Sequence, residues 1–326
     1  MIKLGVLRHG GIMPNYQCTA ACRHCLYACS MDRAGGYMSQ ADMDAVCATL
    51  REGGCRSVHI GGGEPFMDFD GLLALLKTAR SHGISVEYIE TNGYWAASED
   101  GVKKRLQALA CAGADTLCIS VDPYHAEYVP YTAPLNLAKW CRAYGFGYFL
   151  WQERFVPMMQ GLDPNKAHTR AEMEAAISPD YIRDTALAYG IRMGGRAVNI
   201  ADEYYPRKPV EDVVKAGGCR GLQSTDHFHV DMYGRFIPPG CTGIAIPLRE
   251  AVDGVPSGKY PAFEALLKGG VAALLEYAVG LGFVPDARGY TSGCGLCFYL
   301  RRWLSERGGC AELDGEHYLH SFGYYG

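Results

Sequence analysis

Short strand-like runs alternate with helical patterns through about the first two hundred residues of the chain. The strand-like runs cover residues 4–14, 57–61, 85–91, 116–121, 147–154 and 191–198. The helical patterns cover residues 39–53, 69–82, 98–112, 134–144 and 179–189, and Ser39 and Ser98 are the expected N-caps of the first and third. Strands that alternate with helices form parallel sheets, because each helix carries the chain back across one face. The pattern predicts an α/β fold with six such strands.

The alternation stops near residue 200. Residues 203–212 (EYYPRKPVED) have the composition of a linker, and residues 227–239 (HFHVDMYGRFIPP) predict a hairpin with Gly234 at a turn position that needs a positive φ. Two helical stretches follow, at about 261–268 and 271–281. We therefore expect two domains, a βα core over residues 1–205 and a smaller cysteine-rich domain over residues 206–326.

Composition narrows the class of protein. The chain has 326 residues, of which 48% are hydrophobic and 20% charged, and its formal net charge of -4 gives no reason to expect a nucleic-acid or membrane partner. The first residues lack the apolar core and cleavage site of a signal peptide, and no stretch approaches the roughly 18 apolar residues of a membrane span. The sequence therefore predicts a cytoplasmic protein.

Three of the fourteen cysteines form a close array, Cys18, Cys22 and Cys25. Without a secretory signal, cysteines are better interpreted as reduced thiols or metal ligands than as disulfides. Three thiols cannot complete a tetrahedral zinc site, and His24 is disfavoured as a fourth ligand because adjacent residues rarely reach one metal. An iron–sulfur cubane on three thiolates leaves one iron open, so the array predicts a reactive centre. We expect Cys29 to be a packing residue, with a hydrogen donor as the lesser alternative.

The run CTAACRHC after the first strand resembles the cluster motif of the radical S-adenosylmethionine (radical SAM) enzymes. Gly62, Gly63, Glu64 and Pro65 after the second strand are similar to the GGEP motif of that family, which binds the amino group of SAM. Glycines let the backbone approach a ligand, and a glutamate offers an acceptor to an ammonium group. The resemblance implies a partial (β/α)6 TIM-like barrel, a 4Fe-4S cluster on the three thiols, and SAM.

Polar residues at the ends of other strands extend the expected site, because βα barrels build their sites at that edge. By the same resemblance, Ser120 and Asp122 are expected at the SAM ribose, residues 191–195 along the adenine, and Gln152 or Arg154 at the carboxylate. For each of them an ordinary polar loop residue is the alternative. The expected SAM contacts are Gly62, Gly63, Glu64, Pro65, Asn92, Ser120, Asp122, Gln152, Arg154, Met193 and Gly194.

A second cysteine set lies in the last third of the chain. Cys219 and Cys241 flank the expected hairpin, and Cys294 and Cys297 form a later C-x-x-C pair. The arrangement resembles the C-terminal extension of the SPASM and twitch subgroup, which implies one auxiliary 4Fe-4S cluster on these four thiols. A structural zinc ion is the alternative. We expect His227 and His229, on one face of the hairpin strand, to be surface or core residues instead of ligands.

The resemblance implies an enzyme that cleaves SAM to methionine and a 5'-deoxyadenosyl radical, which removes hydrogen from a substrate. It also implies anaerobic chemistry and an electron donor such as flavodoxin or ferredoxin. A peptide substrate is favoured by the SPASM-like extension, although the early first strand leaves no room for a preceding leader-binding domain. The alternatives are a dehydrogenase or epimerase of a sugar or aminocyclitol, and a non-catalytic iron–sulfur or zinc protein. The sequence does not choose among oxidoreductase, isomerase and lyase chemistry.

Overall fold

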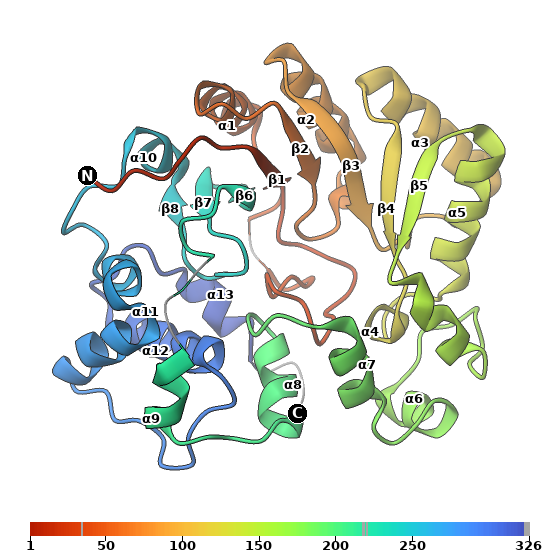
Figure 1. The fold of residues 1–326 in the computed structure, drawn as a ribbon. Helices are drawn as coiled ribbons and strands as arrows, with labels where there is room; N and C mark the ends of the chain where they lie inside the picture. Colours follow the sequence, from red (N-terminus) through yellow and green to blue (C-terminus); the bar gives the residue numbers. More distant parts are fainter. Residues whose placement is uncertain (34, 217–218, 220, 323–326) are drawn as a thin grey trace.

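A single curved sheet is the framework of the protein (Figure 1). The computed structural model describes residues 1–33, 35–216, 219 and 221–322. The sheet has eight strands in the order β5-β4-β3-β2-β1-β6-β7-β8. Strands β1 to β6 are parallel, and β7 and β8 are antiparallel to their neighbours. The strands are β1 (His9–Met13), β2 (Ser57–Ile60), β3 (Ser85–Thr91), β4 (Thr116–Ser120), β5 (Gly147–Trp151), β6 (Asp226–Asp231), β7 (Arg235–Ile237) and β8 (Ile246–Pro247). The α/β class and the parallel sheet are confirmed.

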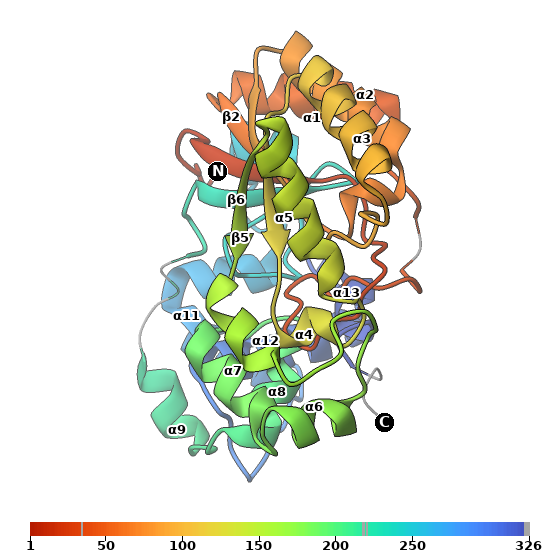
Figure 2. The ribbon, with the colours of Figure 1, turned by 90° about the vertical axis from the view of Figure 1, so that its right-hand side faces the viewer.

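Four helices cover the outer face of the parallel strands (Figures 1 and 2). They are α1 (Gln40–Glu52), α2 (Phe69–Ser81), α3 (Glu99–Ala112) and α5 (Thr132–Tyr144). The predicted caps are confirmed, since the Ser39 side chain accepts from the N–H of Asp42 and the Ser98 side chain accepts from that of Gly101. Helix α1 buries Val46 and Leu50 in the core, and each such side chain contributes about 1.5–3 kcal/mol.

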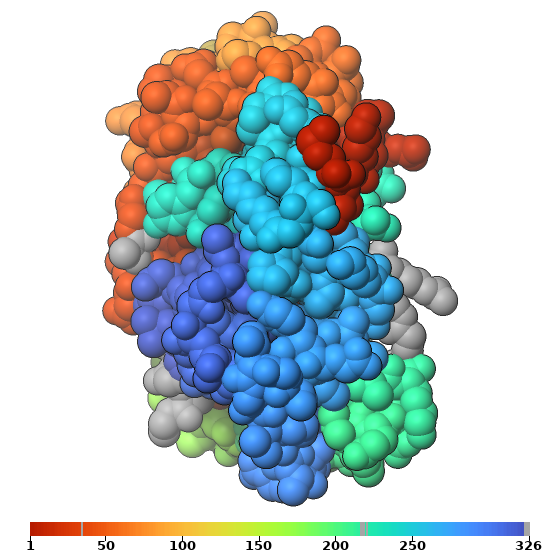
Figure 3. Space-filling model, turned by 90° about the vertical axis from the view of Figure 1, so that its left-hand side faces the viewer, coloured from red at the N-terminus to blue at the C-terminus, as the bar shows by residue number. Residues whose placement is uncertain are grey.

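A second group of helices lies beyond the carboxyl ends of the strands (Figure 1). The remaining elements are η1 (Pro65–Met67), α4 (Pro123–Ala126), η2 (Glu153–Met159), α6 (Arg170–Ala176), α7 (Tyr181–Tyr189), α8 (Ala197–Tyr204), α9 (Val210–Val213), η3 (Val214–Ala216), α10 (Leu248–Asp253), α11 (Pro261–Gly280), α12 (Gly293–Arg307) and α13 (Gly315–Leu319). The first residues of the chain lie beside the segment after α10 (Figure 3), where the N–H of Ile2 donates to the Val255 carbonyl at 2.8 Å.

The prediction of a strand at 191–198 is wrong. Residues 191–196 are irregular, and helix α8 begins directly after them. The reason is a close contact with the cysteine loop, because Gly195 has a φ of 54° and a Cβ at this position would lie 2.3 Å from the Cys25 carbonyl oxygen. The sixth parallel strand is instead β6, which pairs with β1 at the other edge of the parallel set, with Gly11 opposite His229.

The hairpin prediction is confirmed, but the hairpin belongs to the main sheet. Strand β6 pairs antiparallel with β7, and Gly234 between them has a φ of 67°. The carboxylate of Asp231 accepts from the N–H groups of Tyr233 and Arg235, which fixes the turn. Because β6 pairs with β1, the sheet crosses the expected boundary between residues 205 and 206. The division into two domains at that point stays a prediction.

The sequence pattern predicted helix α11 but not helix α12. The two predicted helices at 261–268 and 271–281 appear as α11, which is interrupted by non-helical backbone at Gly269 and Gly270. Helix α12 was not predicted, although Ser292 is a good cap signal and its side chain accepts from the N–H of Gly295. None of the helices in the described ranges has the length and apolarity that crossing a membrane requires.

Candidate active site

The three cysteines of the N-terminal array line one cavity at the carboxyl ends of strands β1 to β4. Cys18, Cys22 and Cys25 lie in the loop that follows β1, and the cavity that they border has a volume of about 120 Å³. The structure therefore brings these thiols together with several of the expected SAM contacts. The other residues that line the cavity are Ala20, His24, Cys29, Gly62, Gly63, Glu64, Glu90, Thr91, Asn92, Ser120 and His125.

Arg196 holds the cysteine loop in place. Its fully buried guanidinium donates to the carbonyl oxygens of Cys22 at 2.9 Å and Cys29 at 2.7 Å, and its backbone N–H donates to that of Cys25 at 3.1 Å. A hydrogen bond from Cys29 and the nearby Arg196 charge together hold the pKa of the Cys25 thiol well below its usual range. Burial raises the pKa values of Cys18 and Cys22. Sequence spacing gave no signal for this role, because it depends on contacts between distant segments.

Close backbone contacts require glycine at positions 62 and 63. The N–H of Gly63 donates to the Asn15 carbonyl at 3.0 Å, and the N–H of Glu64 donates to the Gln17 carbonyl at 2.8 Å. A Cβ on Gly63 would lie 2.0 Å from that Gln17 oxygen, and Gly62 has a φ of 106°. The loop therefore packs directly against the chain that enters the cysteine array.

The Glu64 carboxylate joins the ends of β2 and β3. It accepts hydrogen bonds from Thr91 Oγ1 at 2.9 Å, from the Asn92 N–H at 2.8 Å and from the Phe66 N–H at 3.2 Å. A carboxylate has about four acceptor positions, so one of them remains available to a ligand. Burial raises the pKa of Glu64 to about 7, against the effect of these donors. Pro65, which begins η1, is buried.

Two more expected residues act through neighbours. Asn92 Nδ2 donates to Thr19 Oγ1 at 3.0 Å and to Cys18 Sγ at 3.7 Å, so this side chain reaches from β3 to the cysteine loop. Asp122 is buried, and its carboxylate lies 2.8 Å from His125 Nδ1. Burial opposes charge on both groups, but their attraction still lowers the pKa of Asp122 to about 2 and raises that of His125 well above its usual range. His125 in turn contacts the Cys22 thiol.

Four expected contacts lie elsewhere. Gln152 has a φ of 65° in the turn after β5, and the exposed Arg154 donates to the Ala188 carbonyl on α7 at 2.6 Å. Met193 and Gly194 lie in the irregular segment before α8. None of these four residues is among the described residues that line the cavity. Their roles at SAM stay predictions.

The second cysteine set also gathers in space. Cys219 Sγ and Cys241 Sγ are 3.9 Å apart, and Cys294 and Cys297 lie in the first turn of α12, where residues three apart share a face. Burial raises the pKa values of both Cys294 and Cys297, and the charge of the nearby Cys219 raises them further. A hydrogen bond from Cys241 lowers the pKa of Cys219 to about 6.

A buried cation accompanies this second set. Arg301 on α12 donates to the Thr242 carbonyl at 2.6 Å and to the Tyr318 hydroxyl at 2.9 Å. It also forms a hydrogen bond with the Cys297 thiol, where burial raises the pKa and Arg301 opposes the rise. Thiolates beside a buried guanidinium suit a metal centre, because the cation offsets part of their negative charge. The sequence analysis did not find Arg301.

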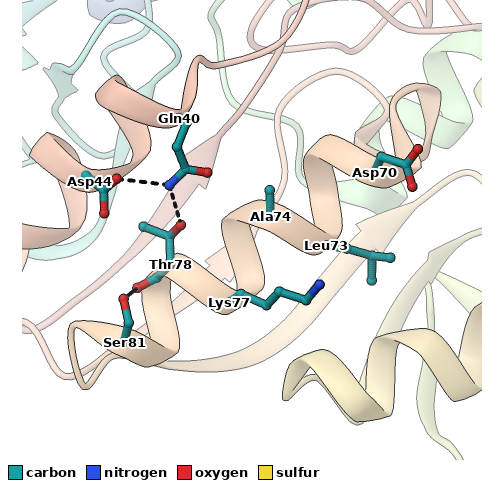
Figure 4. Close-up of a pocket in the computed structure, with 8 residues that line it drawn as sticks. All are labelled: Gln40, Asp44, Asp70, Leu73, Ala74, Lys77, Thr78 and Ser81. Atoms are coloured by element: carbon teal, nitrogen blue, oxygen red, sulfur yellow. Dashed lines mark hydrogen bonds between the residues drawn. The ribbon is translucent and has the colours of Figure 1, made fainter.

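A surface hollow lies between α1 and α2 (Figure 4). Its polar groups pair with one another, since Gln40 Nε2 donates to Asp44 Oδ2 and to Thr78 Oγ1, both at 2.9 Å. Ser81 Oγ donates to the Thr78 carbonyl at 2.8 Å. The eight residues that line the hollow include neither cysteine nor histidine, so the hollow gives no reason to expect catalysis there.

Comparison with known proteins gives one family match and several distant similarities. Residues 12–150 match the radical SAM superfamily. The putative peptide biosynthesis protein YydG of Bacillus subtilis (strain 168) is 24% identical over 128 residues, which are 39% of this chain and 40% of YydG. The similarity thus spans less than half the length of that relative.

Two solved structures illustrate the distant similarities. Streptococcus suis SuiB bound to its precursor peptide SuiA is 14% identical, with a TM-score of 0.39 over 90% of this chain and 76% of SuiB. The structure of tagged anSMEcpe with bound AdoMet is 13% identical, with a TM-score of 0.43 over 96% of this chain and 94% of anSMEcpe.

The family match coincides with the cavity described above. It includes the cysteine loop, the glycine-rich loop of residues 62–64 and strands β2 to β4, whose carboxyl ends form the cavity wall. The match also covers the part of the predicted βα alternation that lies before residue 150. The chain therefore carries a radical SAM domain over residues 12–150.

Proposed function

We propose that this enzyme reductively cleaves SAM and uses the 5'-deoxyadenosyl radical to remove a hydrogen atom from a peptide. The observation that carries the proposal is the convergence of Cys18, Cys22 and Cys25 on one cavity with the loop of residues 62–64. Three thiols and an adjacent loop with one available carboxylate acceptor can serve a cluster and an amino-acid ligand together. A non-catalytic iron–sulfur protein has no need of the adjacent loop or of its available carboxylate acceptor.

The donor set fits a 4Fe-4S cluster. Cys18, Cys22 and Cys25 would hold three of its iron atoms, and their spacing leaves the fourth for SAM. When bound, the cluster supplies the electron that splits SAM into methionine and the radical. Arg196 and the His125–Asp122 pair place positive charge beside Cys25 and Cys22, and so stabilise the thiolate forms that bind iron.

The rest of the cavity would hold and orient SAM. The last acceptor position of Glu64 suits the SAM ammonium group, and the side chain of Ser120 suits a ribose hydroxyl. Asn92 fixes the distance between this region and Cys18 through its two hydrogen bonds. Burial of these groups excludes water from the place where the radical would form.

A peptide is the proposed substrate class. Support comes from the name of YydG, a putative peptide biosynthesis protein, although the similarity covers 40% of that relative. The likeness of the second cysteine set to SPASM and twitch extensions adds to it. We also propose that Cys219, Cys241, Cys294 and Cys297 hold an auxiliary 4Fe-4S cluster, and that a flavodoxin or ferredoxin is the electron donor of the enzyme.

The cleavage step is tested anaerobically with reconstituted protein, dithionite and SAM. Wild-type protein is expected to release 5'-deoxyadenosine, and Cys22→Ala is expected to release none. Cys111→Ser is the matched control, because this exposed thiol lies on α3 and does not line the cavity. Absence of 5'-deoxyadenosine from the wild type with dithionite or a stronger reductant would refute SAM cleavage.

The substrate class is tested separately by deuterium transfer. The deuterated test compounds are peptides encoded by genes that neighbour the gene for this protein, and, for comparison, sugars and aminocyclitols. Mass spectrometry then measures the deuterium in the 5'-deoxyadenosine that forms. Deuterium from a peptide supports the proposal. Deuterium from a sugar or aminocyclitol would replace the peptide by a small molecule and leave SAM cleavage intact.

A further inference from the structure

Histidines from three adjacent strands meet on one face of the sheet. A ring nitrogen from each of His9 on β1, His59 on β2 and His227 on β6 lies within 4.8 Å of the other two. The ring centres are 5.0 Å apart for His59 and His227, and 5.8 Å apart for the two pairs that include His9. These residues come from positions 9, 59 and 227, so only the sheet brings them together.

The neighbouring strand residue leaves room for the rings. Gly11 pairs with His59 on one side and with His229 on the other. A Cβ on Gly11 would lie 2.4 Å from His59 Nε2 and 2.6 Å from His229 Cδ2. The two imidazoles therefore occupy the volume above Gly11 that a side chain would otherwise fill.

An irregularity in β6 directs His227 into this group. The pairing of β1 with β6 shifts between His9 and Gly10, so that His9 faces Asp226 and Gly10 faces Phe228. His227 is the extra residue, and its φ of 61° is unusual for a residue with a side chain. Bulges often re-aim side chains next to functional sites, and strained backbone is concentrated at such sites.

One ring nitrogen in each of two buried histidines, His59 of this group and its neighbour His229, lacks a hydrogen-bond partner. His59 and His229 are 0% and 8% exposed, and the Nδ1 atom of each is buried with no partner among the described residues. An unpaired buried polar atom is costly, and such atoms often indicate a ligand. The Nε2 atoms of His59 and His229 lie 3.0 Å apart and form a hydrogen bond with each other.

A carboxylate orients His9. Glu87 Oε1 lies 3.2 Å from His9 Nδ1, and Ser57 Oγ donates to the same carboxylate oxygen at 2.5 Å. With Nδ1 engaged by the carboxylate, Nε2 is the nitrogen of His9 that remains for a ligand. Metal-bound histidines commonly have this carboxylate partner on the ring nitrogen that does not bind the metal.

We propose that His9, His59 and His227 form a binding site for a divalent transition-metal ion of the zinc class. Zinc–nitrogen bonds of about 2.0–2.1 Å in a tetrahedral site place the nitrogens about 3.3 Å apart and the ring centres about 5 Å apart. The observed ring spacing is close to that value, so small side-chain rotations complete the site. Three histidines leave a fourth position for water or an oxygen ligand, as in catalytic zinc sites.

The site adjoins the cysteine cavity without sharing its ligands. Glu90 Oε1 lies 3.9 Å from His59 Nε2, and Glu90 also lines the cavity. His229 contacts Tyr27 of the cysteine loop, with ring centres 5.2 Å apart. An oxygen donor of a substrate, such as a carboxylate or a carbonyl, is the class of ligand that suits the fourth position.

The test measures zinc affinity of the full chain with its clusters reconstituted, by competition with a chromogenic chelator. Wild-type protein is expected to bind one zinc ion, and His59→Gln and His227→Gln are each expected to weaken binding at least tenfold. His227 is exposed, so its replacement does not disturb the core. Glu87→Ala is expected to weaken binding about 10–100-fold. His82→Gln is the matched control, because this histidine lies after α2 and pairs with Asp44.

Cobalt distinguishes this site from the thiols. Cobalt bound by imidazoles lacks the intense sulfur-to-metal charge-transfer absorption that thiolates give. The proposal is supported if bound cobalt gives a spectrum without that absorption. This cobalt spectrum should be lost in His227→Gln and kept in Cys294→Ala. A thiolate spectrum alone, or zinc affinity that is unchanged in both His59→Gln and His227→Gln, would overturn it. Neither outcome depends on SAM cleavage, which is measured separately as 5'-deoxyadenosine.

Discussion

The side chain of Arg196 and the carbonyl of Cys29 are joined by a 2.7 Å hydrogen bond between residues 167 positions apart. The same guanidinium reaches the Cys22 carbonyl, so one buried side chain holds both ends of the segment that contains Cys25. The shape of the cysteine loop therefore depends on a residue outside the loop. Three thiols at the right spacing do not define the geometry of the site by themselves.

Replacement of Arg196 by methionine should disorder the cysteine loop. Two buried carbonyls would lose their donors, which costs at least about 2 kcal/mol of unfolding free energy. Iron bound per chain and 5'-deoxyadenosine yield should both fall, and Arg196→Lys should restore part of the iron. Arg183→Met is the control, because this partly exposed arginine of α7 pairs with Asp180, and it should keep full iron content. Normal iron content in Arg196→Met would contradict the role assigned to Arg196.

Replacement of Gly63 by alanine should weaken SAM binding. The new Cβ would lie 2.0 Å from the Gln17 carbonyl oxygen, so the loop that carries Glu64 has to move. Such overpacking costs about 1–3 kcal/mol of stability. Isothermal titration with SAM should show a lower affinity, while Gly315→Ala, where a Cβ meets open space, should match the wild type. Equal affinities in the two variants would argue against a SAM site at this loop.

Removal of one thiol from the second set should remove one metal centre. Wild-type protein with two 4Fe-4S clusters should contain about eight iron atoms, and Cys294→Ala about four. Cys111→Ala is the control, because this exposed thiol lies on α3 and outside both sets. About four iron atoms in both wild type and Cys294→Ala, with zinc lost from the variant, would identify the second site as a zinc site.

His317 should make the protein less stable in mild acid. Burial, together with nearby arginines, holds the pKa of His317 well below its usual value of about 6.5. As the pH falls below about 6.5, the unfolded chain binds a proton at His317 that the folded chain does not. The unfolding free energy therefore falls, by up to about 1.4 kcal/mol per pH unit.

The variant His317→Phe isolates this effect. Its ring can retain the contacts with Phe298 and Tyr318, but it cannot bind a proton. Anaerobic urea unfolding at several pH values between about 5 and 7.5 should give a shallower pH dependence for the variant than for the wild type. Parallel profiles would show that His317 does not contribute.

Local signals in the sequence predicted much of the fold and part of the site. Strands β1 to β5 and their helices follow from hydrophobic periodicity and from caps such as Ser39, which involve neighbours along the chain. The gathering of Cys18, Cys22 and Cys25 beside Glu64 follows from motifs at the ends of successive parallel strands. Both kinds of signal lie within a few residues of the feature that they predict.

The rest depends on contacts between distant residues. The position of β6 beside β1 cannot be deduced from the strand itself, because its residues equally suit an isolated hairpin. Arg196 and Arg301 are buried cations whose partners are carbonyls and thiols of other segments. His227 was expected to be a surface or core residue, and only the pairing of β6 reveals that it faces His9 and His59.

The place of β6 also affects how the chain can fold. The hydroxyl of Tyr16, which directly precedes the cysteine loop, donates at 2.9 Å to Asp231 at the end of β6, across 215 residues of sequence. A contact between residues so far apart in the sequence forms slowly, because the intervening chain must first lose conformational entropy. During synthesis, one edge of β1 therefore stays unpaired until more than two thirds of the chain has been made. The wall beside the cysteine loop is completed late, so cluster insertion is best timed after translation has passed β6.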